Sequence, residues 1–177
     1  DNIDKFKKDI EESQNHIKEW QDEVDEYQSN VNKLLEDVKD KDAVTKKLMK
    51  SESIENKLNT KLKTLNNSIR FYEENDSCPS CKQDITESHK NEVFEEKNKK
   101  KKEIEESLTA LEASIREIEE QLNLMNVIVE DVQKIERRIT EKQNQISASS
   151  QYIGKLQTNI ESAMGEGTEV QDAKNEL

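Results

Sequence analysis

The only two cysteines of the chain lie in the segment Cys78-Pro79-Ser80-Cys81, which also holds its only proline. Two thiolates at this spacing can bind one metal ion from one side. A structural zinc ion takes four ligands in a tetrahedron, so the pair supplies half of a zinc site. The spacing predicts metal binding by Cys78 and Cys81. Because the pair supplies two of four ligands, we expect a second molecule to supply the others, so that the metal joins two molecules.

The same cysteines allow other interpretations. A redox-active pair needs a depressed thiol pKa and reductase turnover, and we do not expect a bare helical tip to support either. The chain also lacks the alternating strands and helices of a thioredoxin-like fold. An incidental disulfide or two free thiols remain as a further alternative. A lone pair fits an intracellular metal or redox role better than a secreted disulfide scaffold.

The composition favours long helices over a compact globule. The 177 residues are 38% charged and 31% hydrophobic, with three glycines and a net charge of −12. This charge makes the whole chain a poor ligand for nucleic acid phosphates. No apolar run has membrane-spanning length, so we expect no membrane partner. Because the lone cysteine pair fits an intracellular role, we expect a cytoplasmic location. The chain does not begin with Met, and we expect it to be an internal segment of a longer protein.

A seven-residue apolar repeat occupies the first arm, residues 1–75, and charged residues fill the other positions. This pattern is typical of a coiled coil. Between Val38 and Leu48 the repeat positions are spaced three, three and four residues apart. This spacing predicts a stammer, a local overwinding of the supercoil. Two aromatic residues in the repeat, Trp20 and Tyr27, are expected in the core. The apolar positions of the repeat are Ile3, Phe6, Ile10, Ile17, Trp20, Val24, Tyr27, Val31, Leu34 and Val38.

The second arm, residues 86–163, repeats the pattern, with another expected stammer between Val129 and Ile135. Folding the chain symmetrically at the cysteines places Leu34 opposite Met125, so that apolar positions meet. Because the two stammers do not mirror each other, we expect this register to drift by a few residues. We therefore predict an all-α fold, a long antiparallel intramolecular coiled-coil hairpin. Residues 76–85, the tip loop, carry the Cys-x-x-Cys pair, and residues 164–177 are expected to be a frayed tail. The seam of this arm runs through Ile104, Leu108, Leu111, Ile115, Ile118, Leu122, Met125, Val129 and Val132.

Short-range signals place the ends of the helices around the tip loop. Asn75 tolerates the left-handed conformation that commonly closes a helix, and Pro79 disfavours helix at the residue before it. Thr86, or alternatively Asp84, is a suitable N-cap for the second arm.

Lysines gather on both arms, and we weigh two interpretations of them. They form either a positively charged segment that acts as a hinge or contacts an anionic partner, or a solvated face whose aliphatic stems cover the seam. His16 is expected to be solvated. Neither a phosphate-binding glycine loop nor a pocket for catalysis is evident, so we expect no enzymatic activity from this segment. The lysines are Lys57, Lys61, Lys63, Lys97, Lys99, Lys100, Lys101 and Lys102.

The segment from Cys78 to His89 resembles the zinc hook of SbcC-type, SMC-like DNA repair ATPases. The shared pattern is Cys-Pro-x-Cys, a short polar gap, an aliphatic residue, a Ser/Thr helix cap and a His, flanked by antiparallel coiled coils. The resemblance covers the whole chain, and the composition is similar to that of phage members. The family often has Gly after the second Cys, where this chain has Lys82, whose charge could offset that of a four-thiolate zinc site.

The resemblance implies a specific function. Two hooks from two protomers each give two cysteines to one shared zinc ion, so Cys78 and Cys81 are the implied ligands and the chain is a homodimer. Ile85 packs the hook, and His89 lies on the first turn of the second helix. The linked coiled coils tether ATPase heads that bind DNA ends with a nuclease subunit, in double-strand-break repair and recombination. The alternative of a different class is a metal-free coiled-coil spacer or adaptor.

Overall fold

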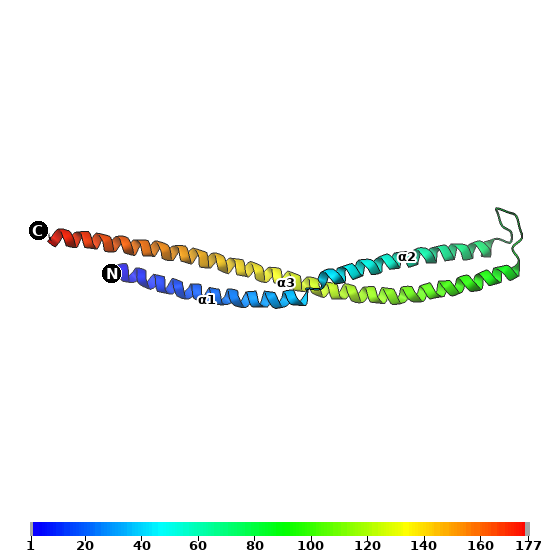
Figure 1. Cartoon of the computed structure of the whole chain (residues 1–177), viewed down its shortest axis with the longest axis horizontal. Coiled ribbons are helices and arrows are strands. Elements are labelled where there is room, and N and C mark those ends of the chain that lie inside the picture. The colour runs from blue at the N-terminus through cyan, green and yellow to red at the C-terminus, as the bar shows by residue number, and fades with distance from the viewer. Residues whose placement is uncertain (1, 176–177) are drawn as a thin grey trace. The chain divides into compact units, whose positions relative to one another are not determined.

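The computed structural model describes the backbone of residues 2–175 and the side chains of residues 2–165, and this part of the chain is all-α. Its helices are α1 (Asn2–Asp37), α2 (Lys41–Glu74) and α3 (Glu87–Asn175) (Figure 1). The one β feature among these residues is an isolated antiparallel bridge between Ser77 and Asp84. The prediction that the chain is all-α is therefore confirmed. Within the described range, every helix is too short or too polar to span a bilayer.

The chain divides into two compact units, each of which contains part of α3. One unit comprises Asp1–Val38 with Val127–Leu177, and the other comprises Lys39–Asn126. No proline lies inside any of the three helices, and apolar residues recur on one stripe of each. A stripe of this kind is stable only when a neighbouring helix covers it, so the two helical segments of each unit pair with each other.

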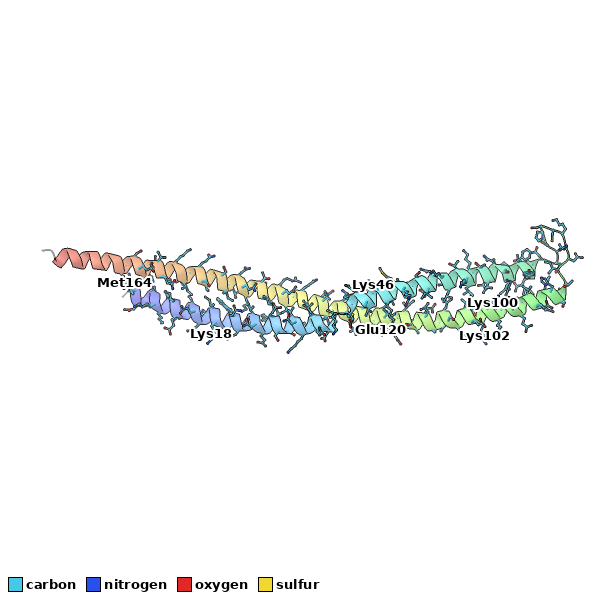
Figure 2. All side chains as sticks on the ribbon, in the orientation of Figure 1. Lys18, Lys46, Lys100, Lys102, Glu120 and Met164 are labelled. Atoms are coloured by element: carbon cyan, nitrogen blue, oxygen red, sulfur yellow. The ribbon has the colours of Figure 1, made fainter. Side chains whose placement is uncertain are left out.

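In the first unit, α1 lies antiparallel to the second part of α3. A buried cluster joins Val24 and Val31 of α1 to Val132 and Ile139 of α3. Tyr27 is among the half-buried side chains that pack against this cluster, as the seam pattern predicted. Polar side chains occupy the outer faces, where Lys18 is exposed to solvent (Figure 2).

In the second unit, α2 lies antiparallel to the first part of α3. Leu65 of α2 shares a shallow groove with Ile104 of α3, whereas Glu52, nearer the start of α2, shares another with Ile115. The buried hydrophobic residues come mainly from α3, and they are Ile69, Leu108, Ile115, Ile118 and Met125. The tip loop joins the two helices at the end of this unit (Figure 1).

The symmetric register is shifted by several residues in both units, which is the drift expected from stammers that do not mirror each other. It places Lys142 opposite Ile17, whereas Lys142 Nζ lies 2.8 Å from Oε2 of Glu23. It also places Lys90 opposite Ile69, whereas Lys90 Nζ lies 2.6 Å from Oδ1 of Asp76. The second contact supplies the reason, because pairing starts where the tip loop closes and not at the midpoint between the cysteines.

The stammer expected after Val38 is a break in the helix. Residues 38–40 form a turn between α1 and α2, with Val38 N–H donating to Leu35 O at 3.3 Å. Val38 itself remains buried. Repeat steps that fall short of a heptad strain a supercoil, and here the strain is relieved by interrupting the helix. The second expected stammer, between Val129 and Ile135, lies within the uninterrupted helix α3.

Helix α3 extends to Asn175, through most of the tail that was expected to fray. The side chains of residues 166–177 lie outside the described residues, as does the backbone of residues 176–177. The fraying of residues 164–177 therefore stays a prediction.

Candidate metal centre

Helix α2 ends at the base of the tip loop by a different cap from the one predicted. Asn75 has extended backbone angles, φ −127° and ψ 128°, and not the left-handed conformation. Its side-chain amide instead donates a hydrogen bond to the Phe71 carbonyl at 2.8 Å. A carbonyl left without a partner in the last turn of α2 is thereby satisfied, and the chain leaves the helix in an extended direction.

The tip loop closes through three backbone hydrogen bonds of 2.8 Å each. Ile85 N–H donates to Asp76 O, Cys78 N–H donates to Gln83 O, and Lys82 N–H donates to Cys78 O. These bonds bring the two ends of the loop together and fold the segment between the cysteines into a tight turn. The backbone alone therefore places Cys78 and Cys81 on the same turn.

Lys82 adopts a positive φ of 62°, and no other non-glycine residue in the described range does so. Glycine reaches this region without steric cost, whereas a residue with a Cβ is strained there. Lys82 directly follows the second cysteine of the pair. The turn therefore requires a glycine-like backbone, and the chain achieves it with a lysine.

Helix α3 begins at Glu87, and Thr86 is its N-cap. Thr86 Oγ1 accepts a hydrogen bond from His89 N–H at 3.2 Å, which resolves the choice between Thr86 and Asp84. His89 is exposed, and its ring meets the Tyr72 ring edge-on, with centroids 5.9 Å apart. Ile85 is half-buried. These contacts anchor the C-terminal end of the tip loop to both helices of the second unit.

The two thiols are free, with Cys78 half-buried and Cys81 exposed. The pKa of the Cys78 thiol is lowered, mainly by a hydrogen bond from the Cys81 backbone N–H, then by one from Ser80 N–H and one from the Cys81 thiol. The expectation that a bare tip would not depress a thiol pKa was therefore wrong. A tight turn aims its own N–H groups at the first sulfur, so no neighbouring cation is needed.

The donor set suits a soft divalent metal. The thiolate is the form of cysteine that binds metals, and hydrogen bonds from N–H groups to Cys78 favour that form. The Cys81 thiol lies 3.7 Å from Gln83 Oε1, a contact at the exposed rim of the loop. Among the side chains of residues 2–165, no group of three or more His, Cys, Asp or Glu converges as a metal site. The pair offers two thiolates, and a tetrahedral zinc ion takes four ligands.

An ion pair at the base of the tip loop, between Asp76 and Lys90, was not predicted from the sequence. Lys90 of α3 is only 5% exposed, and its Nζ lies 2.6 Å from Oδ1 of Asp76. The hydrogen bond and the positive charge of Lys90 lower the pKa of Asp76. A signal was present, because Lys90 falls on the same heptad position as Lys97 and Ile104. A lysine at a seam position beside a loop is a candidate for a buried pair.

The remaining candidates make contacts on their own helices. His16 is exposed, as expected, and stacks on Trp20 with ring centroids 5.7 Å apart. Trp20 itself is half-buried. Among the clustered lysines, Lys100 lies 2.7 Å from Glu96, and Lys102 lies 4.0 Å from Glu106. Both pairs lie within α3, so part of the positive charge is neutralised on its own helix.

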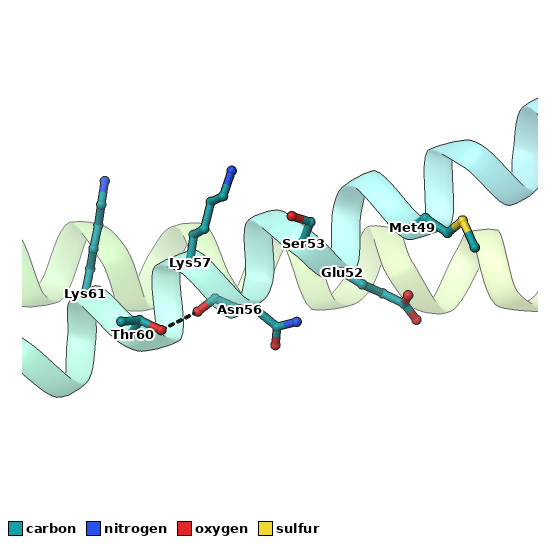
Figure 3. A pocket seen from close by; sticks show the side chains of 7 residues that line it. All are labelled: Met49, Glu52, Ser53, Asn56, Lys57, Thr60 and Lys61. Atoms are coloured by element: carbon teal, nitrogen blue, oxygen red, sulfur yellow. Dashed lines mark hydrogen bonds between the residues drawn. The ribbon is translucent and has the colours of Figure 1, made fainter.

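A shallow hollow lies along the surface of α2 (Figure 3). All of its lining residues come from this one helix, and the Lys57 and Lys61 side chains point away from that of Glu52 (Figure 3). Thr60 Oγ1 donates to Asn56 O at 2.9 Å within the helix. Because its polar groups diverge, the hollow does not assemble a site, and the tip loop remains the candidate functional site.

No protein-family model matches the chain, and neither a curated protein nor a solved structure matches it.

Proposed function

We propose that this chain is a zinc-dependent homodimerisation hook. The observation that carries the proposal is the turn at the tip, where Cys78 and Cys81 lie together and backbone N–H groups lower the pKa of Cys78. Cys78 and Cys81 of each of two copies would hold one zinc ion, which supplies a structural cross-link between the copies. Each chain alone provides too few ligands, so metal binding would stabilise the joined state.

The tip loop suits this role because backbone bonds organise it. The hydrogen bonds between Cys78 and both Lys82 and Gln83 form the turn without metal. A loop that is already folded loses less conformational entropy when it binds an ion. Four thiolates around Zn²⁺ leave an excess of two negative charges, and exposed Lys82 carries a positive charge beside the pair.

The resemblance at Cys78–His89 supports a wider role, which we propose with the hook. The two helix pairs would be segments of a coiled-coil hairpin that belongs to a longer SMC-like ATPase. Two such subunits, linked at their hooks, would be tethered while heads outside this segment act on DNA ends with a nuclease subunit. This role belongs in the cytoplasm, including that of a host cell if the protein is from a phage.

The decisive test measures zinc content and assembly state together. We expect about 0.5 zinc per chain by elemental analysis, since two chains share one four-ligand site. In sedimentation velocity, we expect a zinc-dependent dimer that dissociates when chelator removes the metal. Cys78→Ser and Cys81→Ser should each abolish the dimer and keep the helix content, because neither thiol contributes to a buried core.

Other results would replace the proposal with one of the alternatives. One zinc per monomer would mean a complete metal shell within a single chain. A dimer that ignores both chelator and the cysteine substitutions would favour a metal-free spacer or adaptor. Catalytic turnover in a disulfide reductase assay would favour an oxidoreductase, since a lowered thiol pKa serves that chemistry as well.

A further inference from the structure

Lys90 is the only polar or charged residue that is buried among the described side chains. Its side chain is 7% exposed, whereas that of its partner Asp76 is 96% exposed. The two atoms of the pair, Lys90 Nζ and Asp76 Oδ1, lie 2.6 Å apart. The Lys90 side chain is therefore almost fully buried, and its ammonium contacts the Asp76 carboxylate at the base of the tip loop.

Asp76 joins three parts of the second unit. It is the second residue after the end of α2, its carbonyl accepts a hydrogen bond from Ile85 N–H on the returning strand, and its carboxylate binds Lys90 of α3. Lys90 is held in turn by the helix start, because its N–H donates to Thr86 O at 2.9 Å. The segment from Asp76 to Cys78 is therefore held in place by contacts with both helices.

We propose that Lys90, through its ion pair with Asp76, is a positioning residue for the metal-binding cysteines. The inference rests on the proposed function and adds a residue outside the metal-ligand motif. The ion pair of Lys90 holds residues 76–78 of the tip loop against α3. Cys78 therefore keeps its position relative to Cys81 and to the end of the helix pair. The ion pair thereby aligns two hooks that must meet around one ion.

The energetics of a buried lysine favour positioning over stabilisation. Removing its ammonium from water costs several kcal/mol, and a single contact with the exposed Asp76 carboxylate offsets this cost only in part. An apolar side chain at position 90 would therefore serve the helix pair at least as well. What it would not supply is a directed bond to Asp76, and loss of the bonds that orient metal ligands typically lowers metal affinity 10- to 100-fold.

The test compares zinc affinity and helix-pair stability in Lys90→Met. Methionine matches the length of the lysine stem, and Asp76 is left in water, so no buried charge remains unpaired. We expect the thermal unfolding midpoint of the metal-free chain to stay level or rise, while competition with a chromophoric chelator shows zinc binding about 10- to 100-fold weaker. The d–d absorption of bound Co²⁺ should also change, because it reports ligand geometry.

Two controls separate positioning from general stability. Lys99→Met removes an exposed lysine of the same helix and should leave zinc affinity unchanged. Ile69→Ala weakens the core of the same unit without touching Asp76, so it should lower the unfolding midpoint and affect zinc affinity much less than Lys90→Met does. Zinc affinity in Ile69→Ala that falls as far as in Lys90→Met would overturn the inference.

Wild-type zinc affinity and an unchanged Co²⁺ spectrum in Lys90→Met would also overturn it, and would leave the hook itself intact. If the wild-type chain binds no zinc, the proposed function fails and this inference fails with it. The wild-type measurement therefore tells the two failures apart.

Discussion

Glu23 of α1 and Lys142 of α3 form an ion pair between the two helices of the first unit, with Oε2 and Nζ 2.8 Å apart. Their side chains are 44% and 26% exposed, so the pair borders the buried cluster of Val24 and Ile139. Lys142 occupies a seam position that most heptads give to an apolar residue. Polar seam residues lower stability and select one register, which is the role we assign to this pair.

The first prediction concerns this ion pair. In a double-mutant cycle of Glu23→Gln and Lys142→Gln, we expect a coupling energy of about 0.2–1 kcal/mol in chemical denaturation, as for partly exposed pairs. Raising the salt concentration to 1 M should remove most of it, because screening weakens exposed charges. A coupling that is zero at low salt would contradict the register of the first unit.

A second prediction concerns the core of the first unit. Val31 is 2% exposed and is the most completely buried large side chain described. Val31→Ala should lower the free energy of unfolding by about 2 kcal/mol, from lost apolar burial and the cavity that remains. Leu35→Ala is the matched control on the same helix, because Leu35 is 46% exposed, and its cost should stay within about 0.5 kcal/mol. Equal costs would mean that α1 packs through another face.

Lys82 provides a third prediction through its backbone. Because its φ of 62° suits glycine, Lys82→Gly should preserve the turn and bind zinc at least as well as the wild-type chain. Lys82→Val should weaken zinc binding roughly tenfold or more, since a β-branched residue at positive φ adds about 1–2 kcal/mol of strain. Chelator competition measures both variants.

Lys82→Ala separates backbone from charge in that experiment. It removes the ammonium and keeps a Cβ without branching. If Lys82→Gly, Lys82→Ala and Lys82→Val all lose zinc affinity to the same extent, the charge of Lys82 matters and its backbone conformation does not.

The fourth prediction is the pH dependence of Cys78 reactivity. In the metal-free Cys81→Ser variant, Cys78 is the only thiol, and the backbone N–H groups that lower its pKa are kept. Its alkylation rate by iodoacetamide should rise with a midpoint below that of cysteine in a short peptide. Because the folded tip lowers the pKa, the thiolate favours the folded tip above the ordinary thiol pKa, and this contribution is lost as the pH falls through the lowered value.

Denaturant gives the matching control for Cys78. In the unfolded chain the N–H groups no longer converge on the sulfur, so the alkylation midpoint should return to the peptide value. An identical midpoint in folded and unfolded protein would contradict the hydrogen bonds assigned to the tip.

Much of the local structure follows from residue types and spacing. The heptad residues of both arms predicted helices, and Pro79 and Thr86 predicted the non-helical tip and the start of α3. Tyr27 was expected in the seam and packs against the buried cluster. These outcomes depend on neighbours within one or two helical turns, which is why the chain's order of residues suffices for them.

The pairing of helices and the fine geometry of the tip needed the tertiary structure. The order of residues determines that Cys78 and Cys81 share a turn between two helical arms. Only the folded unit decides that Asp76 meets Lys90, that Lys82 turns left-handed and that residues 38–40 interrupt the helix. Apolar residues that repeat every three or four positions allow several registers of similar burial. The choice among them therefore falls to a few directional contacts between residues far apart in the chain.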